Sequence, residues 1–178
     1  MIYTISQFIG FAAFFVSILA YHKNKKEKIL KNMIMSNVLN LIHYLLLGAY
    51  SGCITKFLAV FRDSFIIMKE GNKKYNKSKY LYIFIMIYII TGIFTYKNIW
   101  SLFPLVAAII YLISIWNGDQ KAIKQIALLC YFLWLTYNIF VFSISGIVSN
   151  IISIISTGIA VYNQNNEIKQ FIKFNDNN

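Results

Sequence analysis

Charged side chains are scarce in this sequence, and their scarcity excludes an ordinary soluble domain. Only 13% of the 178 residues are Asp, Glu, Lys or Arg, and 58% are hydrophobic, whereas soluble domains carry about a quarter charged residues. Acidic residues are the rarest, since six Asp and Glu stand against 17 Lys and Arg, for a net charge of +11. The composition therefore indicates an integral membrane protein.

Cysteine, histidine and proline are scarce, which limits the disulfides, metal sites and helix kinks that the chain can form. Cys53 and Cys130 are expected at different depths of the membrane, so we predict two free thiols instead of a disulfide. Two histidines and two separated cysteines cannot assemble a metal site. The single proline, Pro104, either kinks the fifth predicted helix or starts it. No phosphate loop, nucleophile elbow or carboxylate pair is present, so we expect no cofactor and no enzymatic activity.

Long apolar runs fill much of the chain and predict an all-α membrane protein with seven transmembrane helices. Each run has at least about 17 residues, near the shortest length that crosses the hydrocarbon core. No basic segment precedes the first run, so we expect a retained first helix and no cleaved signal peptide. The polar segment after Asn163 is expected to be a frayed helix or disordered. The predicted spans are residues 3–21, 33–50, 53–69, 80–96, 99–116, 126–143 and 147–163.

The lysines are distributed unevenly between the loops, which predicts the orientation of the helices. Fourteen of the 17 basic residues fall in 22–32, 69–79, 117–125 and the tail, whereas the intervening loops hold only Lys97. Loops rich in Lys and Arg stay in the cytoplasm, so we expect the N-terminus outside and the C-terminus inside. Contact with anionic lipids at this basic face explains the positive charge better than nucleic-acid binding does.

An internal repeat relates the two halves of the chain. Ser51 and Gly52 match Ser145 and Gly146 at a shift of 94 residues. The first three helices then correspond to the last three, and the fourth is a linker that gives both triplets the same orientation, as in SWEET-like proteins. The predicted units are a first repeat (1–69), a basic loop with the linker helix (70–98), a second repeat (99–163) and a polar cytoplasmic tail (164–178).

Polar residues inside the second, third and sixth predicted helices mark the candidate site. A polar group in hydrocarbon is costly unless it faces protein or water, so these residues indicate the interior of the bundle. Helical spacing gathers them into one stripe on the second helix and another on the sixth, across a pseudo-two-fold axis. Such groups either bind a polar solute or only hold the helices together. The candidate solute-binding residues are Asn40, His43, Tyr44, Arg62, Asp63, Trp134, Tyr137 and Asn138.

Arg62 and His43 are the two candidates for which a functional role and a structural role differ most clearly. Arg62 lies near the middle of its helix, where a guanidinium either anchors an anionic or hydroxyl-bearing group or locks the bundle. Neighbouring helix positions point apart, so Asp63 is expected to compensate Arg62 through water or to pair elsewhere. His43 either couples transport to protons or serves as a neutral hydrogen-bonding residue.

Small residues form a stripe on the first predicted helix and another on the seventh. At three- and four-residue spacing they occupy one face of each helix and permit close approach of the backbones. We therefore interpret both stripes as packing seams. They consist of Gly10, Ala13, Ser17, Ala20, Ser149, Ser153, Ser156 and Ala160.

One set of motifs runs through the chain and comprises residues 7–10, residues 43–52, Arg62, Pro104, residues 134–138, and Ser145 with Gly146. In these motifs the chain resembles the YgjV family of bacterial inner-membrane proteins. The resemblance covers nearly the whole chain and implies a multi-pass protein of the bacterial cytoplasmic membrane. More distantly, the chain is similar to SWEET and PQ-loop proteins, which share the three-plus-one-plus-three plan. That likeness implies movement of a sugar or another small solute by alternating access.

We expect a small-solute transporter or facilitator with no cofactor, whose partners are the lipid bilayer and a small polar solute. The alternative is a membrane protein that binds a ligand or partner without transport, as a receptor or scaffold does. The chain departs from the PQ-loop pattern because Gln7 is preceded by no proline and Pro104 is followed by no glutamine. The identity of the solute and the oligomeric state stay open.

Overall fold

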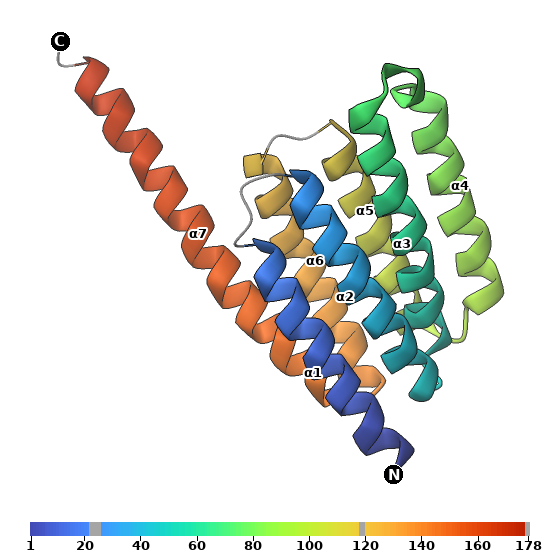
Figure 1. The fold of residues 1–178 in the computed structure, drawn as a ribbon. Helices are drawn as coiled ribbons and strands as arrows, with labels where there is room; N and C mark the ends of the chain where they lie inside the picture. The colour runs from blue at the N-terminus through green and yellow to red at the C-terminus, as the bar shows by residue number, and fades with distance from the viewer. Residues whose placement is uncertain (22–25, 118–119, 177–178) are drawn as a thin grey trace.

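The computed structural model describes residues 1–21, 26–117 and 120–176, and these residues form seven α-helices, two short 3-10 turns and no strand. The 3-10 turns are Lys73–Tyr75 and Ile99–Leu102. The predicted all-α fold is therefore confirmed. The helices are α1 (Ile2–Tyr21), α2 (Lys26–Leu46), α3 (Tyr50–Gly71), α4 (Ser78–Thr95), α5 (Phe103–Asn117), α6 (Gln120–Phe140) and α7 (Ile144–Asp176) (Figure 1).

The helices pack as two groups of three, with α4 at the edge. Helices α1, α2 and α3 pack in succession, and so do α5, α6 and α7. The two groups meet where α1 contacts α7 and where α3 contacts α5. Helix α4 packs on α3 and α5 at the side of the bundle, and the C-terminal part of α7 extends away from the other helices (Figure 1).

The chain alternates direction, so that its lysine-rich connections gather at one end of the bundle. The start of α2, the α3–α4 connection, the end of α5 and the C-terminal end of α7 all lie there (Figure 1). The N-terminus and the α2–α3 and α6–α7 turns lie at the opposite end (Figure 1). The uneven distribution of lysine along the sequence thus becomes a difference between the two ends of the folded bundle.

Four helical segments among the described residues are long and apolar enough to cross a membrane. Only 11% of the α4 segment is buried inside the protein, so most of its apolar side chains face outward. Of the other three helices, α6 has a shorter apolar part, Gln125–Phe140, and α2 and α3 contain no described segment that is both long and apolar enough. The four segments are Ile2–Leu19, Ser78–Thr95, Ile99–Trp116 and Ile144–Tyr162.

Several helices extend beyond the predicted spans because polar segments continue them. Helix α2 begins at Lys26, ahead of the predicted start at residue 33. Lys and Glu are good helix formers, and Glu27 pairs with Lys31 one turn later at 2.6 Å. Helix α6 likewise begins at Gln120 instead of residue 126. The segment after Asn163, predicted as a frayed helix or disordered, belongs to α7.

The α2–α3 and α6–α7 turns have the same hydrogen bonding. In each, a residue with positive φ (Gly48, 66°; Phe142, 54°) donates its N–H to the carbonyl three residues back. The following residue, Ala49 or Ser143, donates its N–H to the carbonyl five residues back. This pattern is a Schellman motif, which satisfies the last carbonyls of a helix. The α2–α3 turn is thus centred on Gly48, slightly before the predicted end of the second span at residue 50.

Pro104 starts a helix and does not kink one. It lies in the first turn of α5, where the backbone N–H that proline lacks would have no partner within the helix. The preceding 3-10 turn is capped by Asn98, whose side chain accepts a hydrogen bond from the backbone N–H of Ser101 at 3.2 Å. The second of the two alternatives for Pro104 is therefore correct.

Candidate functional site

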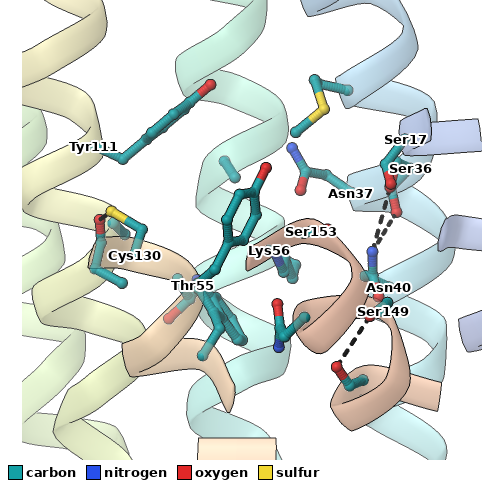
Figure 2. Close-up of a pocket in the computed structure, with 18 of the residues that line it drawn as sticks. Ser17, Ser36, Asn37, Asn40, Thr55, Lys56, Tyr111, Cys130, Ser149 and Ser153 are labelled. Atoms are coloured by element: carbon teal, nitrogen blue, oxygen red, sulfur yellow. Dashed lines mark hydrogen bonds between the residues drawn. The ribbon is translucent and has the colours of Figure 1, made fainter. Parts of the chain in front are cut away.

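A cavity of about 130 Å³ lies inside the bundle. Six helices line it, and α4 contributes no described residue. Figure 2 shows Tyr111 and Cys130 on one side of this cavity and Asn37 and Asn40 on the other. A protein cavity of roughly 150 Å³ can hold one benzene molecule, so this cavity accommodates a very small solute or a few water molecules.

Most of the predicted site residues line this cavity. Helical spacing brings the stripes of α2 and α6 to it from opposite groups of helices, as the sequence predicts. The other three candidates, His43, Asp63 and Tyr137, are buried beside it and hold lining residues or turns in place. The lining candidates are Asn40, Tyr44, Arg62, Trp134 and Asn138.

Arg62 and Asp63 form a direct ion pair, and this differs from the prediction that they point apart. The Arg62 Nε donates to Asp63 Oδ1 at 2.8 Å, and Nη2 lies 2.8 Å from the same oxygen. The Asn37 amide donates to the second oxygen, Oδ2, at 2.9 Å. Both charged side chains are buried, with exposed fractions of 5% and 1%. The spacing rule describes the directions of Cβ atoms, but the long arginine side chain folds back to reach the adjacent carboxylate.

Tyr44 and Asn138 connect the two groups of helices. The Tyr44 hydroxyl donates to Asn138 Oδ1 at 2.8 Å, and the two residues are 94 positions apart in the chain. The Tyr44 ring also stacks on Trp134, with 5.6 Å between ring centroids. The Trp134 ring carries a further contact from Lys56, whose ammonium lies 4.0 Å from the ring centroid. Trp134, a predicted solute-binding residue, therefore already contacts protein groups on its ring.

His43 holds the α6–α7 turn. Its Nδ1 lies 2.6 Å from the carbonyl oxygen of Ser6, and its Nε2 lies 2.8 Å from Ser143 Oγ. A carbonyl can only accept, so Nδ1 carries a proton. Ser143 Oγ accepts from the backbone N–H of Gly146 at 3.1 Å, which leaves its own proton free to donate to Nε2. The neutral imidazole is thus fully satisfied, as expected of a structural histidine.

Tyr137 holds the α2–α3 turn in a reciprocal way. Its hydroxyl accepts from the backbone N–H of Gly52 and from Ser51 Oγ, each at 3.0 Å. The same hydroxyl donates to the carbonyl of Ala49 at 3.3 Å. A Cβ on Gly52 would lie 2.9 Å from Cε1 of Tyr137, so the contact needs glycine. Helix α2 therefore holds the turn after α6, and α6 holds the turn after α2.

Lys56 and Cys130 line the cavity but are absent from the predicted set. Lys56 could have been found by the rule applied to Arg62, since an ionisable residue inside an apolar helix is a functional candidate by default. Cys130 donates a weak hydrogen bond to the Ala107 carbonyl at 3.3 Å. Both Cys130 and Cys53 are free thiols, as predicted.

The small-residue stripes contribute to the lining of the cavity as well as to helix packing. Gly10 packs tightly, because a Cβ there would collide with the side chain of Ser145, and this agrees with a packing seam. Gly10, Ser17, Ser149 and Ser153 also line the cavity. Packing alone therefore does not account for these four positions.

The sequence model of a protein family described as "Imp-YgjV: Bacterial inner membrane protein" matches residues 4–167. The matched range contains every residue that lines the cavity. No curated protein and no solved structure matches the chain. The distant likeness to SWEET and PQ-loop proteins therefore stays a prediction.

Proposed function

The chain belongs to the Imp-YgjV family of bacterial inner membrane proteins, and we propose that it is a small-solute transporter or facilitator with its solute site in the central cavity. The observation that carries the proposal is the convergence of polar groups from six helices on one cavity. Outside the cavity, the same bundle exposes long apolar segments. Polar groups within a membrane bundle are costly unless they face protein, water or a solute.

The proposed topology has seven passes, with the N-terminus outside and the C-terminus in the cytoplasm. It is supported by the gathering of the lysine-rich connections at one end of the bundle (Figure 1). Helices with polar residues, such as α2, α3 and α6, can cross a membrane when other helices shield their polar groups from lipid.

Two parallel repeats are part of the same proposal. The matching Schellman turns support them, as do the reciprocal contacts of His43 and Tyr137, which occupy positions 94 residues apart. These contacts hold the two groups of helices together at the end that carries the N-terminus (Figure 1). Alternating access would require this end to open by separation of the two turns while the opposite end closes.

Flux measurements on the purified protein in liposomes test the proposal. The probes are radiolabelled glycerol, alanine, acetate and butyrate, each compared with protein-free liposomes. We expect flux of at least one probe, and we expect a small maleimide or methanethiosulfonate reagent to block it by modifying Cys130. The Cys130→Ala variant should resist the block, whereas Cys53→Ala should stay sensitive, because Cys53 is buried away from the cavity lining.

Two results would argue against transport through the cavity. Flux that the thiol reagent blocks equally in Cys130→Ala and in the unmodified protein would place the solute path elsewhere. Specific binding of a probe without flux of any probe would favour the alternative, a receptor or scaffold that binds its ligand without moving it.

A further inference from the structure

The charges around the cavity do not cancel. Lys56 and Arg62 are cations that line the cavity, and among the described residues the one anion beside them is Asp63. Arg62 and Asn37 already occupy both carboxylate oxygens of Asp63. Lys56 forms no ion pair and donates no hydrogen bond to any residue that the structure describes, and its ammonium contacts the Trp134 ring at 4.0 Å. The site therefore has one positive charge without a counter-charge.

An unpaired ammonium inside a membrane protein is unfavourable. Burial of a charge is costly unless it is paired and hydrogen-bonded. A cation–π contact compensates only part of this, at about 2 kcal/mol when desolvated. An anion within the cavity would supply the missing charge, and the ammonium has three N–H groups with which to bind it.

Two amide groups of the cavity are also available to an anion. Asn138 uses its Oδ1 to accept from Tyr44, and its Nδ2 donates to no residue in the described part of the chain. Asn150 lines the cavity from α7 and is 9% exposed, and the structure gives its side-chain amide no described partner either. Both are N–H donors, the groups that a carboxylate accepts from.

The remaining walls set the size and polarity of the ligand. Much of the lining is apolar, and the volume of about 130 Å³ excludes large solutes. A bare inorganic anion would leave the apolar walls without contacts, and a disaccharide would not fit. The apolar lining residues include Phe14, Met33, Ala59, Ala107, Ala108 and Ala127.

We infer that the cavity binds a small organic monocarboxylate, with its carboxylate on Lys56 and the Asn138 amide and its short apolar body against the alanine-lined wall. The inference rests on the proposed function only in taking the cavity as the solute site. It requires binding and does not require flux.

The experiment measures the thermal stability of the detergent-purified protein with butyrate and with butyramide at equal pH and ionic strength. Butyrate has as many non-hydrogen atoms as benzene, and butyramide has the same shape without the charge. A ligand that binds the native state raises the melting temperature by mass action. We expect butyrate to raise it in a saturable manner and butyramide to have little effect.

Two lysine variants separate the cavity site from a general effect of charge. Lys56→Met should weaken the apparent affinity for butyrate by roughly 10- to 100-fold, the loss expected for one charged hydrogen bond. Lys69→Met is the matched control and should bind butyrate normally. Lys69 also lies 4.0 Å from a tryptophan ring centroid, that of Trp116, but it donates to the Trp116 carbonyl at 2.7 Å and lies outside the cavity lining.

Equal effects of butyrate and butyramide on the unmodified protein would overturn the inference, whether or not the variants fold. Normal butyrate binding by Lys56→Met would overturn it too. Butyrate binding without flux would support the anion site and contradict transport. Flux of glycerol or alanine without stabilisation by butyrate would support transport and contradict the anion site.

Discussion

Replacement of Arg62 by Met should destabilise the protein far more than replacement of Arg62 and Asp63 together. The single change removes the 2.8 Å ion pair and leaves the Asp63 carboxylate, 1% exposed, with only the Asn37 amide as a described donor. Breaking a buried pair by removing one partner costs about 3–5 kcal/mol. For a chain of this length each kcal/mol corresponds to roughly 2–4 °C, so the melting temperature should fall by about 10 °C.

The double variant Arg62→Met, Asp63→Asn separates loss of the ion pair from loss of packing. The new amide keeps an oxygen acceptor for Asn37 and removes the unpaired charge, so most of the stability should return. Melting curves in detergent, followed by circular dichroism, give all corners of the double-mutant cycle, with Asp63→Asn alone as the fourth protein. A double variant that melts as early as Arg62→Met would refute the ion pair as the cause. A single variant as stable as the unmodified protein would refute the reasoning altogether and favour Arg62 as a solute anchor.

The Gly52→Ala variant should lose about 1–3 kcal/mol of stability, because the new Cβ would lie 2.9 Å from a tyrosine ring. The Gly158→Ala variant should gain stability, because a Cβ there would have no atom within 4 Å. A Gly52→Ala protein that melts at a higher temperature than the Gly158→Ala protein would contradict the packing described at Gly52. The His43→Gln variant should melt at a lower temperature, but the pH profile of flux between about pH 5.5 and 8 should not change, since both nitrogens of the neutral ring are hydrogen-bonded. Loss of the pH dependence in this variant would support a proton-coupling role for His43. A cysteine introduced at Asn72 should react with a labelling reagent only from the cytoplasmic side, and one introduced at Asn98 should react only from outside. Reaction of the cysteine at position 72 with a reagent added outside intact cells would contradict the topology.

The order and approximate position of the helices could be predicted because long apolar runs are a strong signal. The ends of the helices could not be predicted, because there the signal changes from hydrophobicity to helix propensity. At Lys26 and Gln120 the chain becomes polar while remaining helical. Hydropathy therefore marks where the apolar part of a helix stops, whereas the helix itself continues where the residues are good helix formers, with small support from pairs such as Glu27 with Lys31.

The candidate site was partly predictable for a similar reason. Helical spacing correctly grouped Asn40 with Tyr44 and Trp134 with Asn138, since side chains one turn apart share a face. The position of Arg62 near the middle of its helix left both a binding role and a bundle-locking role open, because position alone cannot say which carboxylate a cation pairs with. The ion pair with Asp63 is an argument for the second role. Helical spacing also gave no role to Lys56, whose partner ring lies on α6.

The long sequence separation of the contacts across the two groups has a consequence for synthesis in the cell. The carboxylate of Asp63 can pair as soon as α2 and α3 have left the ribosome, because its partners are Asn37 and Arg62. His43 must wait for a serine 100 residues later, and Tyr44 for an asparagine 94 residues later. At about 5–20 residues per second this delay lasts roughly 5–20 s. In the proposed seven-pass topology the first half would expose a polar face to lipid during that time, so we expect the newly made protein, more than the finished one, to be a target for membrane chaperones and proteases.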